Sequence, residues 1–132
     1  MNKVLTLLLM SGMGIAQISQ EAYNIEMAKA HARNAIPELR MMMKDPGSFT
    51  LIQVIAIVKP NKKDATKPSF RGCIRYVASN SYGGRSQACG GYRVDKKGHM
   101  TVFPGPQNEE ACACTVNSGE NYRDVTSDAE NW

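Results

Sequence analysis

The chain has 132 residues, of which 42% are hydrophobic, and a formal net charge of +4 at pH 7. This length suits one domain with a core of ordinary size and leaves little chain for a second module. The positive surplus is small and its densest part is interrupted by an acidic residue and prolines, which argues against a nucleic-acid-binding function.

The first sixteen residues have the layout of a secretory signal peptide. Lys3 supplies a single positive charge, an uncharged apolar run follows, and small residues stand at Gly14 and Ala16, where a signal peptidase requires them. The alternative, a membrane anchor, needs about 20 apolar residues, and this run is shorter and gives way to polar residues from Gln17 on. We therefore predict cleavage after Ala16 and a mature chain without a membrane span, located in the periplasm or secreted.

The mature chain begins with the clearest periodic pattern in the sequence, and this pattern predicts a helix. Because Asp45 precedes Pro46, helical backbone angles are disfavoured at Asp45, and we expect the helix to end at Lys44. The pattern keeps its phase across Pro37, so we predict a kink, or a short second helix in line with the first. Steps of three or four draw the apolar residues into one stripe along this helix, namely Ile18, Ala22, Ile25, Ala28, Ala32, Ala35, Leu39 and Met42.

Two strands are predicted after the helix. Residues 49–58 are rich in β-branched side chains and apolar at nearly every position, which predicts a central strand covered on both faces. Residues 70–78 alternate, so that Phe70 and Tyr76 share one face while Arg71 lies on the other.

Further strands follow at short spacing. Residues 85–94 predict a strand in which Gly90 and Gly91 indicate a bulge. The turn sequence at 95–98 then leads into a short strand over 99–103. Connections this short favour an antiparallel meander.

The pattern as a whole predicts an α+β fold. A single domain over residues 17–103 would pack an N-terminal helix, kinked near Pro37, on a three- to four-stranded antiparallel meander. Residues 104–132 are polar and contain few large apolar side chains, so we expect an irregular, cysteine-containing tail anchored by Val125 and Trp132.

An even number of cysteines in an exported chain predicts disulfides, because the thiols meet an oxidising compartment. If the turn at 80–84 centres on Ser81, Cys73 and Cys89 face each other closely enough to be bridged. Each of the two other pairings would tie the tail back to the hairpin, so the connectivity stays open. The four candidates are Cys73, Cys89, Cys112 and Cys114.

The closely spaced Cys112 and Cys114 also raise an alternative function. A Cys-x-Cys pair can bind a soft metal such as Cu(I), with His99 or Met100 nearby, or take part in thiol redox chemistry. Metal sites usually show paired ligand motifs of fixed spacing, and the sequence has none. We expect no metal and no cofactor.

The sequence shows no pattern typical of an enzyme. His31 and His99 belong to no recognised motif, and we expect both to be exposed to solvent. A thiol oxidoreductase would place Cys-x-x-Cys at the start of a helix, and this chain does not. We expect no catalytic activity.

The most conspicuous candidate binding surface is the hairpin around the stretch NSYGG. Asparagine, serine and the paired glycines suffice to reverse a chain, so a turn explains the stretch without a ligand. Paired glycines also bring backbone amides close to an anion when arginines lie beside them. The candidate hairpin residues are Arg75, Asn80, Ser81, Tyr82, Gly83, Gly84 and Arg85.

A second basic stretch, KPNKKDATKP, is predicted to be a solvated hairpin loop. Its lysines also leave open an anion-binding or membrane-surface function. They are Lys59, Lys62, Lys63 and Lys67.

Two stretches together resemble a family of small exported bacterial proteins of unknown function, with Lys-Asp-Pro-x-Ser and Cys-x4-Ala-x-Asn-Ser-x-Gly-Gly elements. The first is Lys44 to Ser48, and the likeness covers Leu39 to Val94. The second consists of Cys73, Ala78, Asn80, Ser81, Gly83 and Gly84. Where the family often has Gly-Glu after the cysteine, this chain has Ile74 and Arg75, and it has Arg85 where an aromatic often follows the glycines. The resemblance implies a helix packed on a small antiparallel sheet and brings no known activity.

These observations predict an exported, disulfide-stabilised, non-catalytic binding or structural module of the cell envelope. Its expected partner is an unknown protein or a component of the envelope. The alternative is a thiol-redox or copper-binding protein that uses Cys112 and Cys114.

Overall fold

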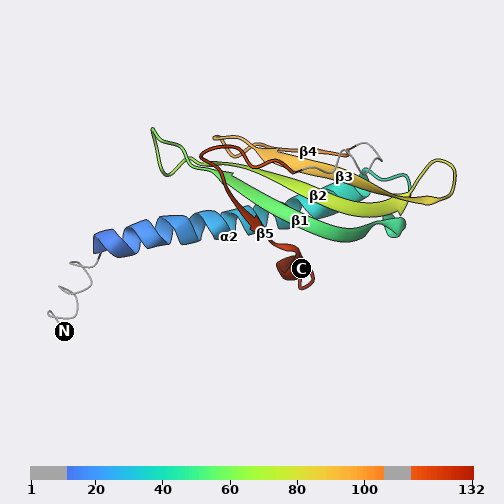
Figure 1. Ribbon diagram of the computed structural model, residues 1–132, viewed down its shortest axis with the longest axis horizontal. Helices are drawn as coiled ribbons and strands as arrows, with labels where there is room; N and C mark the ends of the chain where they lie inside the picture. The colour runs from blue at the N-terminus through green and yellow to red at the C-terminus, as the bar shows by residue number, and fades with distance from the viewer. Residues whose placement is uncertain (1–11, 106–113) are drawn as a thin grey trace.

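The computed structural model describes the backbone of residues 12–105 and 114–132, and the side chains of these residues from Gln20 on. A helix, α2, lies across one face of a five-stranded antiparallel sheet of order β4-β3-β2-β1-β5, which confirms the predicted α+β class (Figure 1). The elements are α2 (Gly12–Met41), the 3-10 turn η1 (Pro46–Ser48), β1 (Thr50–Lys59), β2 (Ser69–Ser79), β3 (Arg85–Val94), β4 (Met100–Phe103), β5 (Asn121–Asp124) and α3 (Thr126–Ala129).

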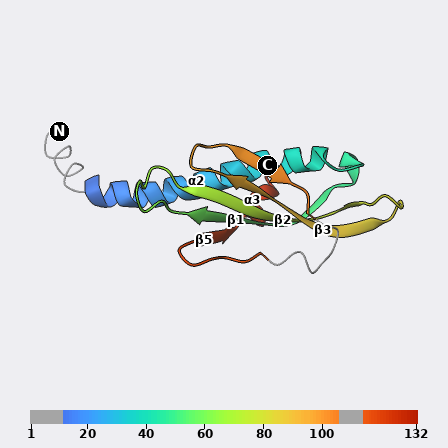
Figure 2. The same cartoon turned by 90° about the horizontal axis from the view of Figure 1, so that it is seen from above.

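The sheet has one strand more than the three or four predicted, and it comes from the segment expected to be irregular. β5 pairs antiparallel with β1, with Ile55 opposite Asp124 and Val58 opposite Asn121. β5 is an edge strand of the sheet and lies beside β1 (Figure 2). All four residues of β5 are exposed, so no apolar alternation marked the strand in the sequence.

The central part of α2 packs as its stripe predicts. Four stripe residues are buried against the sheet, namely Ala28, Ala32, Ala35 and Leu39, while Ala22 remains exposed. The helix continues through Pro37 as a single helix and ends at Met41, three residues before the predicted Lys44. Small side chains along the stripe let the helix approach the sheet closely.

β1 lies between β2 and β5, as predicted for a central strand, but its face away from α2 is only partly covered, because Ile55 there is half-buried. Val54, Ala56 and Val58 are buried on the face toward α2, and Ile57 is buried on the opposite face. The register with β2 shifts between Leu51 and Gln53, which marks an irregularity in β1.

The bulge predicted at Gly90 and Gly91 is wrong, because β3 pairs with β2 without a register shift along its whole length. The two glycines serve close packing. A Cβ atom at Gly90 would lie 2.8 Å from the carbonyl oxygen of Phe103, and one at Gly91 would lie 2.6 Å from that of Gly72. Side chains at these positions would push the neighbouring strands apart.

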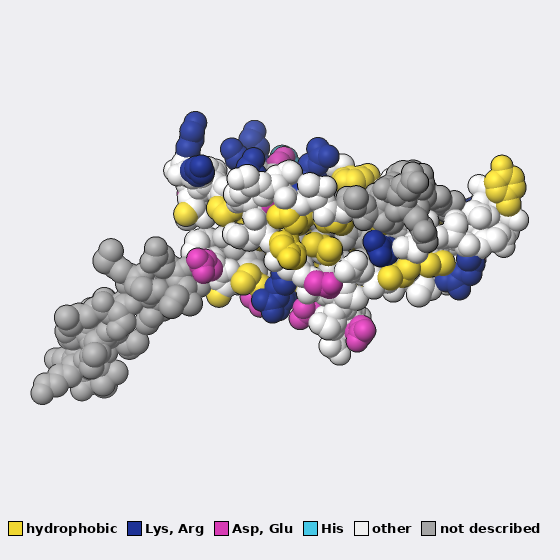
Figure 3. Space-filling model, in the orientation of Figure 1, with side chains coloured by type: hydrophobic (Ala, Val, Ile, Leu, Met, Phe, Trp, Pro, Cys, Tyr) yellow, Lys and Arg dark blue, Asp and Glu magenta, His cyan; other side chains and the backbone are white. Residues whose placement is uncertain are grey.

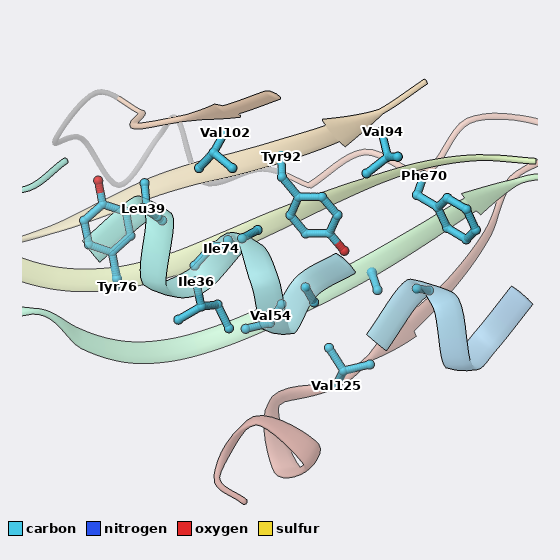
Figure 4. Close-up of a cluster of buried hydrophobic side chains, with 14 of the residues drawn as sticks. Ile36, Leu39, Val54, Phe70, Ile74, Tyr76, Tyr92, Val94, Val102 and Val125 are labelled. Carbon is cyan, nitrogen blue, oxygen red and sulfur yellow. The ribbon is translucent and has the colours of Figure 1, made fainter. Parts of the chain in front are cut away.

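The core fills the space between α2 and the sheet (Figure 4). Tyr76 and Tyr92 are the largest fully buried side chains, and the ring of Phe49 stacks on Tyr76 with 5.1 Å between centroids. Burial raises the pKa of the Tyr92 phenol. Removal of this apolar surface from water, at about 25 cal/mol per Å², is the main force that holds α2 to the sheet.

Candidate functional site

The stretch from Asn80 to Gly84 forms a self-contained turn between β2 and β3. The Asn80 amide donates to the carbonyl oxygen of Gly84 at 2.7 Å, and the Gly83 amide donates to that of Asn80 at 3.2 Å. The Asn80 side-chain oxygen accepts from the amides of Tyr82 and Gly84. Gly83 has a φ of +83°, which favours glycine. Ser81 and Tyr82 are exposed at the tip, and the side chain of Tyr82 is 97% exposed.

Arg85 and Ser48 join this hairpin to the segment that follows α2. The Arg85 guanidinium donates to the carbonyl oxygen of Ser48 and to the hydroxyl of Thr50. The Ser48 hydroxyl donates to the carbonyl oxygen of Asp45 and accepts from the amide of Ser79 at 2.8 Å. The two short sequence elements are thus in direct contact, and Arg85 fixes the chain rather than pointing free into solvent.

Arg75 does not join the turn residues. It lies inside β2 on the face opposite α2, with Cys89 beside it on β3 and Gln53 beside it on β1. Its Nε atom is buried and has no hydrogen-bond partner within the described ranges. The predicted hairpin site is therefore divided between a surface-exposed tip and a separate arginine within the sheet.

A disulfide joins Cys73 on β2 to Cys114 in the C-terminal segment, with 6.0 Å between their Cα atoms. The bridge between Cys73 and Cys89 that a turn centred on Ser81 would favour is therefore wrong. The turn centres on Tyr82, which places Cys73 opposite Gly91 and moves Cys89 opposite Arg75.

The remaining cysteines bear on the redox alternative. Cys89 is also disulfide-bonded, and Cys112 lies outside the described residues. The bond between Cys73 and Cys114 belongs to one of the two pairings that tie the tail to the hairpin. In this oxidised form the Cys114 sulfur is engaged and is not available as a ligand for Cu(I).

An ion pair reinforces the disulfide on the same face of the sheet. The guanidinium of Arg71, two residues before Cys73, contacts both carboxylate oxygens of Glu120, at 2.7 and 2.9 Å, and also donates to the carbonyl oxygen of Thr115. The Glu120 side chain is only 6% exposed. No sequence pattern marks this pair, because its members lie 49 residues apart.

The environment of Glu120 favours its charged form. The hydrogen bond from Arg71 is the largest cause, and together with a hydrogen bond from the Asn117 amide and the nearby charge of Lys59 it lowers the pKa of Glu120 from 4.5 to about 2. Glu120 is therefore ionised at neutral pH and holds the C-terminal segment against β2.

His31 is half-buried, which differs from the expected exposure to solvent. Its ring lies 4.7 Å from the ring of Phe70, and burial lowers the pKa of the imidazole. His99 is exposed as predicted and lies 3.4 Å from Asp95 within the β3–β4 turn. The two histidines lie on different elements, and neither contacts a nucleophile among the described residues.

Two further carboxylates accept hydrogen bonds from neighbouring side chains and amides. Asp124 accepts from Thr126 and Gln53, and Asp64 accepts from Thr66. Over residues 12–105 and 114–132, no three His, Cys, Asp or Glu side chains gather as a metal-binding group.

A shallow groove lies between α2 and the C-terminal helix α3. It has a volume of about 370 Å³ and is lined by Arg33, Arg40, Leu51 and Trp132 among others. Lys29 lies 3.5 Å from Asp128 and links α2 to α3 beside it.

Comparisons with protein-family models, with curated proteins and with solved structures find no match to this chain. None of the helices in the described part is long and apolar enough to cross a membrane.

Proposed function

We propose that this chain is a small exported protein of the cell envelope that acts as a disulfide-stabilised, non-catalytic binding or structural module. Its mature form begins at Gln17 and resides in the periplasm or outside the cell. The observation that carries the proposal is the disulfide between Cys73 and Cys114. Such bonds persist in oxidising compartments and are rare in the cytosol.

The polar contacts of the candidate site support a structural and not a chemical use. Arg71 and Glu120 satisfy each other, and Asn80 caps its own turn. Arg85 and Ser48 hold the hairpin to the end of α2. Groups committed to such contacts stabilise a rigid scaffold, which is what a binding module needs.

The hairpin tip is the surface best suited to a protein partner. Tyr82 projects from a turn whose backbone is fixed by a hydrogen bond to Asn80. The exposed ring is therefore carried by a loop with little conformational freedom. Tyrosine is enriched in energetically important contacts between proteins because it combines a large apolar area with a polar end.

The proposal is tested by expressing the full chain beside a Leu8→Arg variant, whose apolar run is interrupted. The wild-type protein should be recovered from the periplasm or medium, starting at Gln17 and without titratable thiols before reduction. The variant should stay in the cytosol with reduced cysteines. A wild-type protein found in the cytosol with Met1 intact and free thiols would contradict the proposal. Exported protein with reactive Cys112 and Cys114 thiols, or with bound copper, would support the redox or copper-binding alternative.

A further inference from the structure

Two connections that are distant in sequence meet at one end of the sheet. The β1–β2 loop covers residues 60–68, and the β3–β4 turn covers residues 95–99. Phe70, near the start of β2, pairs with Val58 on β1 and Val94 on β3, so the loop that leads into β2 lies beside the turn that leaves β3, and the centres of the two connections are two strand spacings apart. At about 4.8 Å per strand spacing, they lie roughly 10 Å apart. Both lie at the end of the sheet where α2 projects beyond it, away from the β2–β3 hairpin (Figures 1 and 2).

This end carries most of the positive surplus of the chain. The two connections contain five lysines and two carboxylates, Asp64 and Asp95. Their net charge is therefore +3, out of +4 for the whole chain. Figure 3 shows Lys and Arg side chains gathered over these connections. The lysine end, as we name it, consists of Lys62, Lys63, Lys67, Lys96 and Lys97, all of them exposed.

Among the described residues, the carboxylates nearby form an ion pair with only one of these lysines. Asp64 lies 3.8 Å from Lys67. The side chain of Asp95 is occupied by its own turn, because it accepts from the amides of Lys97 and His99 and pairs with the His99 ring. Four lysine ammonium groups have no carboxylate within ion-pair distance in the described part of the chain, namely Lys62, Lys63, Lys96 and Lys97.

Residues of the two connections and of α2 line an open hollow of about 230 Å³. Lys67, Lys96 and Lys97 line it together with His31 and Tyr23. The Tyr23 side chain is 57% exposed although it belongs to the helix that forms the core. The lysine end thus combines uncompensated cations with an exposed aromatic ring.

We propose that the lysine end docks this protein on a bilayer surface rich in anionic headgroups. The proposal rests on export to the envelope and names the component that the module contacts there. Lysine is a hydrated point charge on a flexible stem, which suits a diffuse field of phosphates better than one bidentate ligand. Tyrosine favours the headgroup level of membranes, where one part of the ring is apolar and the hydroxyl is wet. In this orientation the Tyr82 tip at the opposite end of the sheet points away from the bilayer.

The test measures cosedimentation of the exported protein with vesicles of phosphatidylcholine, alone or with phosphatidylglycerol. Two double variants each remove two charges from one connection: K62Q/K63Q from the β1–β2 loop and K96Q/K97Q from the β3–β4 turn. The matched control, K44Q/R123Q, removes two exposed charges elsewhere on the protein. Each lysine near such a surface contributes about 1 kcal/mol, so each patch variant should weaken binding roughly 30-fold. Salt at about 1 M should abolish binding, since the Debye length falls to about 3 Å.

The results separate this proposal from its rivals. Binding only to phosphatidylglycerol vesicles, lost in both patch variants and kept in the control, would support it. Equal binding to neutral vesicles would overturn it and indicate a retained apolar leader, as would wild-type binding by both patch variants. An equal loss of vesicle binding in the control variant would show that binding depends on the overall charge of the protein and not on the lysine end. Binding to a soluble polyphosphate but not to vesicles would also overturn it. Thiol titration of the same sample reports on export independently, so the two proposals can fail separately.

Discussion

The two faces of the sheet are covered in different ways. The face toward α2 carries apolar side chains such as Val54, Ile74 and Tyr92, and the buried core residues of the described chain are all hydrophobic. On the opposite face, Cys73 and Arg71 bind the C-terminal segment through a disulfide and an ion pair. One face is held by the hydrophobic effect, and the other by links between specific pairs of residues.

This difference makes the faces respond to different conditions. Apolar burial depends little on redox state or on pH near neutrality. The links on the opposite face depend on an oxidising compartment and on an ionised Glu120. The C-terminal segment should therefore come loose under conditions that leave α2 in place.

Removal of the disulfide should have the largest effect. In the chain-entropy model, opening a loop closed across 41 residues costs about 4 kcal/mol, so Cys73→Ala with Cys114→Ala should lower the free energy of unfolding by about that amount. Urea unfolding without reductant measures it, with Ser81→Ala as an exposed control. An unchanged midpoint would show that the tail is held by other contacts.

Truncation on the α2 face should cost slightly less. Leu39 is fully buried, and Leu39→Ala should lower the free energy of unfolding by about 3 kcal/mol through lost burial and a cavity. Met41→Ala, at a side chain that is 72% exposed on the same helix, should change it by less than about 0.5 kcal/mol. Equal effects of the two changes would contradict the packing of α2 described above.

Acid should act on the linked face first. Because the pKa of Glu120 is lower in the folded chain, about 2 against 4.5, the unfolded chain binds more protons between these values. The stability that Glu120 contributes is therefore present above pH 4.5 and is lost as the pH falls toward 2. Glu120→Gln should reduce stability at pH 7 by about 1–2 kcal/mol and flatten this decline, as measured by thermal unfolding from pH 7 to 2. A variant with the wild-type pH profile would exclude Glu120 as the cause.

The smallest predicted effects on stability are in the β2–β3 hairpin, where truncation of Asn80 should cost more than truncation of Tyr82 at the tip. Asn80→Ala removes the acceptor for two backbone amides and should cost about 1 kcal/mol. Tyr82→Ala should leave stability within about 0.5 kcal/mol of wild type, since the ring is exposed. Chemical denaturation of both variants checks this, and a larger loss for Tyr82→Ala would mean that the tip is structural.

The α2 face was predictable because its signals are local. The stripe from Ala28 to Leu39 repeats at helical spacing, and the alternation over 70–78 repeats at strand spacing. The turn at 95–98 follows from its own residues, and the Gly98 amide indeed donates to Asp95. Such patterns need no knowledge of distant contacts.

The linked face could not be predicted in the same way. Arg71 and Glu120 carry no pattern that relates them, and β5 lacks an apolar face because it lies at the exposed edge. One of the pairings left open, Cys73 with Cys89, is excluded for a geometric reason. Moving the centre of the turn from Ser81 to Tyr82 displaces every cross-strand partner by two residues, which separates Cys73 from Cys89.

Peptide mapping of the exported protein under non-reducing conditions tests the central claim most directly. Trypsin should leave residues 72–75 linked to residues 98–123, and the N-terminal peptide should start at Gln17. In Cys114→Ala, residues 72–75 should be released with an alkylatable Cys73. Free residues 72–75 in the wild-type digest, or recovery of wild-type chain with Met1 and four alkylatable thiols, would contradict an exported module closed by the bond between Cys73 and Cys114.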